Sequence, residues 1–291
     1  MNANALSTNK LIAISDLIRL PKQQGTLLVL WPTLWSLFIA SDGVPQLKHL
    51  IIFILGTFLM RSAGCAVNDI ADRNFDPHVE RTKTRPLANG RLNVGEALFI
   101  FVSLLALAFV LVLFLNTFTI MLSLVGVLLA SVYPFVKRYS HFPQVVLGMA
   151  FGWGAVMAWA TVKGSLDIIP ILIFLANIFW STAYDTIYAL MDIDDDIKIG
   201  VKSTAIFFGN KVYLALTLLY ISVTILLGVA GVLSGLGFIY ISGIALSLIM
   251  FLLIVAALKK SPTREMAFKG FIANAILGGF ILIAVIADMK F

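Results

Sequence analysis

The chain has 291 residues, of which 60% are hydrophobic and only 12% are charged, and its mean hydropathy is +0.99. This is the composition of a membrane protein and excludes an ordinary soluble domain. A single cysteine, Cys65, excludes an internal disulfide framework and a cysteine-built zinc site. The net charge of +6 could indicate binding to nucleic acid, but the placement of the basic residues is better explained by the orientation of the chain in a membrane.

Nine apolar segments are each long enough to cross a bilayer as a helix. Most connectors are short, but long polar connectors follow the second and the sixth segments. No Gly/Ser-rich or low-complexity tract divides the chain. We therefore expect one all-α domain over residues 1–291, with nine transmembrane helices around a central cavity. The segments are predicted at about 23–41, 48–67, 96–115, 117–136, 143–162, 168–191, 212–233, 236–258 and 268–288.

The distribution of lysine and arginine predicts the orientation, because cytoplasmic loops carry an excess of these residues. With the N-terminus inside, 17 of the 21 basic residues fall on the cytoplasmic side. The opposite side has only Lys48, Lys163 and Lys290. Arg61 lies within a span near its cytoplasmic end, where its side chain can snorkel to the interface. Both long polar connectors are then cytoplasmic.

The first of two acidic clusters follows the second apolar segment and runs from Asn68 to Asp76. On a continuous helix Asn68, Asp72 and Asp76 lie at i, i+4 and i+8, on one face. Carboxylates that share a face repel one another and need cations nearby. Their hard oxygen atoms suit Mg²⁺ better than a soft metal, so we predict a magnesium site here.

The second cluster follows the sixth segment and runs from Asp185 to Asp196. On a continuous helix Asp185, Asp192 and Asp196 again share one face. The pair Asp72/Asp76 precedes the pair Asp192/Asp196 by the same 120 residues at both members. Four spans separate the clusters, so the two halves run in the same sense. This is the pattern of a parallel internal repeat.

Basic segments accompany the clusters at 79–92, 133–138 and 197–203. Carboxylates beside fixed cations suit a diphosphate with bridging Mg²⁺, because the metal joins carboxylate to phosphate oxygen and Arg and Lys neutralise the remaining charge. At the membrane surface the diphosphate would sit in water while its hydrocarbon tail lies between helices. An allylic diphosphate leaves with its charge stabilised in this way, and an electron-rich aromatic ring can attack the allylic cation.

Five ordered motifs carry a resemblance to a known family. They are N-x-x-x-D-x-x-x-D at 68–76, R-T-x-x-R-P-L at 81–87, Y-P-x-x-K-R at 133–138, Y-D-T-x-Y-A-x-x-D at 184–192 and G-V-K-S at 200–203. With these motifs the chain resembles the membrane-bound prenyltransferases of the UbiA family over essentially its whole length. The stretch 184–203 is the most specific for the branch that prenylates 4-hydroxybenzoate.

The resemblance implies roles for individual residues. Lys137 and Lys202 would approach the diphosphate, and Arg138 would hold the carboxylate of the aromatic acid. An active-site aspartate, with Asp185 as the candidate, would polarise the phenol. Asp76 would support both the metal and catalysis. The residues implied to bind Mg²⁺ and the diphosphate directly are Asn68, Asp72, Asp192 and Asp196.

The implied reaction is the Mg²⁺-dependent transfer of a polyprenyl group from polyprenyl diphosphate to 4-hydroxybenzoate, at the ring carbon next to the hydroxyl, in ubiquinone biosynthesis. The expected location is a bacterial-type inner membrane, crossed several times, with the active site facing the cytoplasm. The two substrates and membrane lipid are the expected partners, and nucleic acid is not.

Several alternatives stay open. A UbiA-family enzyme can prenylate another aromatic ring or haem. CDP-alcohol phosphatidyltransferases also use Mg²⁺, but their D-G-x-x-A-R run is absent from this chain. A secondary transporter shares repeats and intramembrane charge, although its site should lie near the membrane midplane. Lys137, Arg138 and the run 81–91 also fit simple positive-inside anchors.

The basic-residue asymmetry predicts the topology of both acidic connectors. Single cysteines placed at Thr84 and Ser203 should be labelled from the cytoplasmic side by a membrane-impermeant reagent, and one at Asp42 from the opposite side. Because native Cys65 would add background, it is first replaced by serine. Labelling of positions 84 and 203 from opposite sides would refute the parallel repeat.

Overall fold

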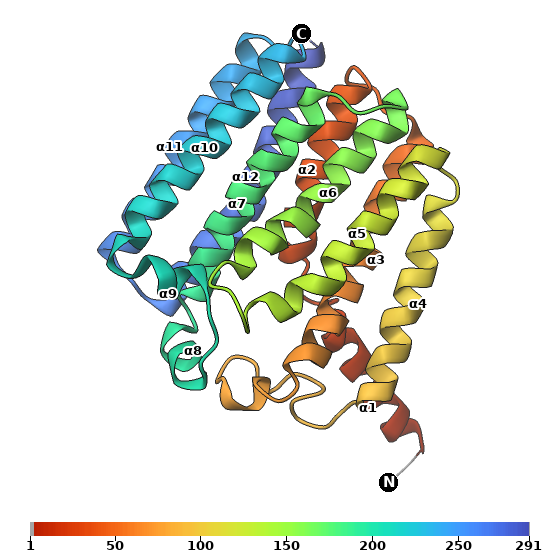
Figure 1. Ribbon diagram of the computed structural model, residues 1–291, viewed down its shortest axis with the longest axis vertical. Coiled ribbons are helices and arrows are strands. Elements are labelled where there is room, and N and C mark those ends of the chain that lie inside the picture. The colour runs from red at the N-terminus through yellow and green to blue at the C-terminus, as the bar shows by residue number, and fades with distance from the viewer. Residues whose placement is uncertain (1–2, 291) are drawn as a thin grey trace.

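The computed structural model describes residues 3–290, and its regular elements over that range are all helices (Figure 1), which confirms the all-α prediction. The short elements are α1 (Ala3–Leu17), η1 (Asp76–His78), α8 (Ile193–Ile199), α9 (Thr204–Phe208) and η2 (Gly209–Lys211). The long helices are α2 (Gln24–Ala40), α3 (Leu47–Asp72), α4 (Val94–Val112), α5 (Thr117–Val136), α6 (Pro143–Lys163), α7 (Ile168–Ala189), α10 (Val212–Leu233), α11 (Phe238–Lys260) and α12 (Arg264–Lys290).

Each of the nine predicted apolar segments forms one long helix, but the number of spans differs from the prediction. Within the described residues, 8 helices are long and apolar enough to cross a membrane. The exception is α2, which has 17 residues. At a rise of about 1.5 Å per residue it extends about 25 Å, less than the roughly 30 Å of a hydrocarbon core. By length and composition the structure thus has 8 candidate spans among the described residues, one fewer than the nine predicted, and the remaining predicted segment is the shorter apolar helix α2.

The long helices pack side by side in one bundle (Figure 1). The second half packs in chain order, with α7 against α6 and α10, and α11 against α10 and α12. The contact of α12 with α2 joins the two halves, and α4 packs chiefly on α3. The lower end of the view holds α1, α8 and the loop that follows α3, whereas α12 finishes at the upper end. Both acidic clusters thus lie at the end of the bundle where α1 lies.

An aromatic core is shared by α2, α7, α10 and α12. The rings of Trp35 and Trp180 lie 5.2 Å apart, and both side chains are buried. Asn274 Oδ1 accepts hydrogen bonds from Trp180 Nε1 at 2.9 Å and from the Tyr220 hydroxyl at 3.0 Å. Because lipid offers no hydrogen-bond partners, this saturation of buried polar groups stabilises the contacts among α7, α10 and α12.

The first acidic cluster does not lie on one continuous helix. Asn68 and Asp72 share the last turn of α3, where the Asn68 amide donates to Asp72 Oδ2 at 3.1 Å. Asp76 lies beyond the helix, at the start of η1. Pro77 follows it, and a residue before proline disfavours the helical conformation. The predicted shared face holds for Asn68 and Asp72 and is wrong for Asp76.

The second cluster is broken as well. Asp185 lies on α7, which ends at Ala189. Asp192 precedes α8, and its carbonyl accepts from the backbone amide of Asp196 at 2.8 Å, so a new helix begins here. The prediction of one helical face from Asp185 to Asp196 is therefore wrong. The break changes the chain direction between the two helices, which local periodicity does not reveal.

The close packing of α12 against α2 and α7 generates a stability prediction. A Cβ atom at Gly278 would lie 2.2 Å from Trp31 Cδ1 and 2.7 Å from Trp180 Cη2, and neither ring can move freely. Gly278→Ala should therefore lower the unfolding temperature in detergent by several degrees, as overpacking typically costs about 1–3 kcal/mol.

The matched control is Gly228→Ala on α10, where an added Cβ meets no atom within 4 Å. Alanine has a higher helix propensity than glycine, so this variant should unfold at the wild-type temperature or slightly above it. Equal unfolding temperatures for the two variants would contradict the proposed steric contact.

Candidate active site

A polar cavity lies where the ends of α3, α5 and α7 meet α8, the loop after α3 and the loop after α8, with an empty volume of about 870 Å³. It contains eight of the nine site residues predicted from the sequence: Asn68, Asp72, Asp76, Lys137, Asp185, Asp192, Asp196 and Lys202. The two acidic clusters, distant in sequence, therefore line one space. Other polar side chains that line it are Arg81, Arg85, Tyr133, Gln144 and Tyr188.

Fixed cations from separate segments pair with three of the carboxylates. Asp192 accepts from Arg81 Nε at 2.8 Å and from Nη2 at 2.5 Å, both at Oδ2. Asp76 Oδ2 lies 3.0 Å from Arg85 Nη1. Lys137 forms an ion pair with Asp72. The sequence predicted two of these partners only as members of a basic run.

Two carboxyl groups of the cavity, one of them already paired with a cation, have raised pKa values. Burial, and then the neighbouring Asp192, raise the pKa of Asp196 to about 6. Burial also raises the pKa of Asp76, although the Arg85 guanidinium opposes this shift. An added cation in the cavity would lower both pKa values.

The donor set fits a hard cation held together with a phosphate. Asp72 Oδ1 is buried and has no hydrogen-bond partner among the described residues. All the carboxylate and amide oxygens around the cavity are hard ligands of the kind Mg²⁺ takes. Yet no three Asp, Glu, His or Cys side chains within residues 3–290 converge closely enough to hold a metal ion by themselves. Oxygen atoms from a ligand would have to complete the coordination.

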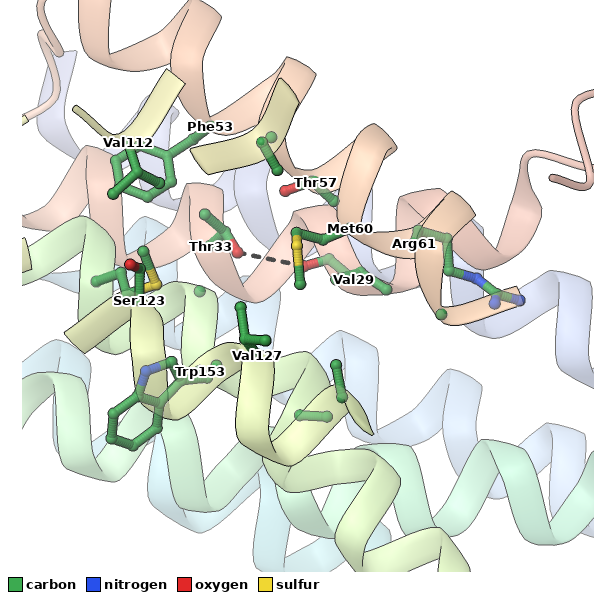
Figure 2. A pocket seen from close by; sticks show the side chains of 18 of the residues that line it. Val29, Thr33, Phe53, Thr57, Met60, Arg61, Val112, Ser123, Val127 and Trp153 are labelled. Atoms are coloured by element: carbon green, nitrogen blue, oxygen red, sulfur yellow. Dashed lines mark hydrogen bonds between the residues drawn. The ribbon is translucent and has the colours of Figure 1, made fainter. Parts of the chain in front are cut away.

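A second cavity is apolar and shares the lining residue Tyr133 with the polar one; its empty volume is about 1130 Å³ (Figure 2). Its walls come from α2, α3, α4, α5 and α6. Phe53 and Arg61 lie toward opposite ends of the space. Tyr133 lines both cavities, and its hydroxyl donates to Asn68 Oδ1 at 3.2 Å. A ligand with a polar head and a hydrocarbon tail could therefore pass Tyr133 and occupy both spaces.

Arg61 is a functional candidate that sequence reasoning interpreted only as a snorkelling residue. It lines the apolar cavity, and its Nη1 lies 2.7 Å from Cys65 Sγ. Among the described residues no carboxylate lies within 4 Å of its guanidinium. Gly25 leaves room for it, because a Cβ there would lie 2.7 Å from Arg61 Nη2. Its position inside a span was the only signal in the sequence.

Arg138 is the one predicted site residue that lines neither cavity. Its Nη2 donates to the carbonyl of Ala71, and its guanidinium lies 5.3 Å and 5.5 Å from the ring centres of Phe135 and Phe75. These contacts join α3 to the end of α5. Its predicted role toward the aromatic acid stays a prediction.

The chain is similar to known proteins over nearly its whole length. It is 51% identical over 274 residues to 4-hydroxybenzoate octaprenyltransferase of Citrobacter koseri, covering 94% of both chains. It is 49% identical over 291 residues to 4-hydroxybenzoate octaprenyltransferase of Cronobacter sakazakii, covering 99% of both.

Among solved structures, a UbiA homolog from Aeropyrum pernix K1 superposes with a TM-score of 0.77 at 26% identity, covering 90% of this chain and 98% of that one. A UbiA homolog from Archaeoglobus fulgidus bound to GPP and Mg²⁺ superposes with a TM-score of 0.71 at 18% identity, covering 96% and 100%. At that identity the likeness establishes the fold alone. The model of the UbiA prenyltransferase family matches residues 29–275. With this match, the shared fold and the near full-length relatives, the chain belongs to the UbiA prenyltransferase family.

Proposed function

We propose that this protein transfers a polyprenyl group, octaprenyl by analogy with its named relatives, from the diphosphate to 4-hydroxybenzoate. The observation that carries the proposal is that one residue, Tyr133, lines both a polar and an apolar cavity. One cavity has the carboxylates and cations that a metal-bound diphosphate needs, and the other has the apolar wall that a prenyl chain needs. The relatives' names support the aromatic acid as acceptor.

In this proposal the diphosphate binds in the polar cavity between the two acidic clusters. Asn68, Asp72, Asp76, Asp192 and Asp196 would hold Mg²⁺, which when bound screens the charge that develops on the leaving diphosphate. The cations Arg81, Arg85, Lys137 and Lys202 line the same space and can donate to the phosphate oxygens. They also lower the free energy of the departing diphosphate, because they are in place before the bond breaks.

The prenyl chain extends from the polar cavity past Tyr133 into the apolar cavity. This places the reacting carbon near the Tyr133 ring, and an aromatic face attracts a developing cation. The hydrogen bond from the Tyr133 hydroxyl to Asn68 fixes the ring in place. When the carbon–oxygen bond to the diphosphate breaks, the aromatic ring carbon next to the hydroxyl forms the new carbon–carbon bond and loses its proton to a base.

The acceptor binds, in this proposal, between Arg61 and Asp185. Arg61 has a guanidinium without a carboxylate partner, and an aromatic acid supplies one. Asp185 lines the polar cavity and would accept a hydrogen bond from the phenol, which makes the ring more electron-rich. Deep placement of the acid would also keep water from the allylic cation.

We also propose that the active site faces the cytoplasm. Both acidic clusters lie at the end of the bundle that carries α1, and most basic residues are predicted on that side. The acids lie at one end of the bundle rather than at its middle, which favours an enzyme over a secondary transporter. Naphthoate and haem stay as alternative acceptors.

The proposed reaction can be tested with the full-length protein in detergent, where no ion gradient exists. With octaprenyl diphosphate, 4-hydroxybenzoate and Mg²⁺, mass spectrometry should detect the 3-prenylated acid, while 1,4-dihydroxy-2-naphthoate should give none. Excess chelator should abolish the product and Mg²⁺ should restore it, because carboxylate and phosphate oxygens need a hard cation. Full activity in chelator, or product from the naphthoate alone, would refute the proposal.

The two candidate arginines give a second test. A guanidinium can form two parallel hydrogen bonds to a carboxylate, which an ammonium cannot copy. Arg61→Lys should therefore raise the KM for 4-hydroxybenzoate roughly ten- to a hundred-fold, from a loss of about 1.5–3 kcal/mol, with a smaller change in the KM for the prenyl diphosphate.

The matched variant is Arg138→Lys, which keeps the charge at a residue outside both cavities. Its effect on the KM for 4-hydroxybenzoate should be much smaller than that of Arg61→Lys. The reverse order of the two effects would assign the acid to Arg138, as the family resemblance implies, and remove Arg61 from the acceptor site.

A further inference from the structure

Asp69 is the one acidic residue of the first cluster that the proposed reaction does not use. It lies on α3 between Asn68 and Asp72, is fully buried, and lines neither cavity. Its Oδ1 accepts from Arg19 Nη2 at 2.6 Å and lies 3.2 Å from Arg85 Nη1. Its Oδ2 is buried and has no hydrogen-bond partner among the described residues. A buried carboxylate with these contacts is an anchor for cations rather than a ligand for substrate.

Arg85 is shared between Asp69 and a residue of the site. Its Nη1 lies 3.1 Å and 3.0 Å from the two carboxylate oxygens of Asp76. Asp76 faces the polar cavity, so a ligand there can draw its oxygens away from Arg85. Asp69 does not reach the cavity, so its contact with Arg85 persists whatever the cavity holds. Arg85 thus has one exchangeable partner and one permanent partner.

We propose that Asp69 is a positioning residue that holds Arg85 at the cavity wall while Asp76 turns to the metal-bound diphosphate. The inference rests on the proposed function only in taking a metal-bound diphosphate as the ligand. Without Asp69, Asp76 is the only carboxylate among the described residues within 4.0 Å of the Arg85 guanidinium, and the two then form an ion pair that no second carboxylate shares. A carboxylate held in this way competes less well for a metal, and the guanidinium is less free to donate to phosphate.

The N-terminal helix takes part in this arrangement through Arg19. Arg19 supplies the second cation that makes a buried carboxylate at Asp69 tolerable. The same side chain donates through Nη1 to the carbonyl of Asp16 at 2.5 Å, at the end of α1. Arg19 therefore stabilises Asp69 and joins α1 to α3, whereas the contact that matters for the diphosphate is between Asp69 and Arg85.

The test compares Asp69→Asn with wild type, using the full-length protein in detergent and two readouts. Calorimetric titration with inorganic diphosphate in the presence of Mg²⁺ should give a Kd raised roughly tenfold, as expected for loss of one charge-assisted contact. The KM for the prenyl diphosphate should rise in parallel, while kcat and the KM for 4-hydroxybenzoate change much less. If Asp69 had a purely structural role, the variant would have a lower unfolding temperature and a lower kcat, without a selective rise in the Kd for diphosphate and the KM for the prenyl diphosphate.

Two control variants distinguish the contact between Asp69 and Arg85 from the contacts that attach α1 to the bundle. Asp16→Asn removes an ion pair between α1 and the loop after α3, with Arg91 at 2.6 Å, and should leave the Kd for diphosphate within about twofold. Arg19→Gln removes one of the two cations beside Asp69 but keeps both Asp69 and Arg85, so it should weaken diphosphate binding much less than Asp69→Asn. The proposal is overturned if Asp69→Asn binds diphosphate like wild type, or if Arg19→Gln weakens binding equally.

If Asp69→Asn does not fold, Arg85→Lys decides the question, because Arg85 Nη1 makes the contacts to both carboxylates and a lysine ammonium ends one bond short of that atom. It should show the same rise in Kd, and an unchanged Kd refutes the proposal. The diphosphate titration does not involve the aromatic acceptor. Normal binding by wild type without prenylated product would therefore refute the proposed function and not the role of Asp69.

Discussion

The structure depends on keeping a group of carboxylates partly buried at the edge of an apolar bundle. Burial and mutual repulsion both disfavour such a group unless cations lie within reach. Those cations come from distant parts of the chain: Arg81 pairs with Asp192 across 111 residues, and Lys137 pairs with Asp72 across 65. The site therefore forms only when the bundle assembles. The pair of Arg81 with Asp192 holds the loop after α3 against the segment that follows α7, and the pair of Lys137 with Asp72 joins the end of α5 to the end of α3.

The need to keep the carboxylates near water and cations explains why one of the two cavities lined by Tyr133 is polar and the other is apolar. Water and cations reach the bundle end, whereas the space among α2 to α6 is lined almost entirely by hydrocarbon side chains. An amphiphile would therefore bind with its head fixed by charge and its tail selected by shape. Among the described residues Arg61 is the one charged residue in the apolar wall, and a carboxylate is the ligand group that its charge would favour.

Much of this architecture could be predicted from the sequence. The apolar segments correctly predicted the nine long helices of the described residues. The acidic clusters and their accompanying motifs correctly predicted eight of the residues that line the polar cavity. The helix ends could not be predicted, because α3 stops at Asp72 and α7 at Ala189 in stretches that keep a helical pattern. The pairing of Arg85 with both Asp69 and Asp76 depends on how the loop folds back, which no local pattern encodes.

The two acidic clusters also show what a sequence repeat does and does not preserve. Their aspartates have the same spacing of 120 residues, yet Asp72 ends a helix while Asp192 precedes one. Both clusters nevertheless place carboxylate oxygens around the same cavity. In the proposed function they face one metal-bound diphosphate, so both need the same chemical groups. The surrounding helices differ, since the second half fills its interior with Trp180, Tyr220 and Asn274 while α3 to α6 leave room for a chain. The polar cavity thus takes carboxylates from both acidic clusters, whereas the apolar cavity is lined, within the described residues, by the chain from α2 to α6 alone, and only the first of these features corresponds to a matching pattern in the sequence.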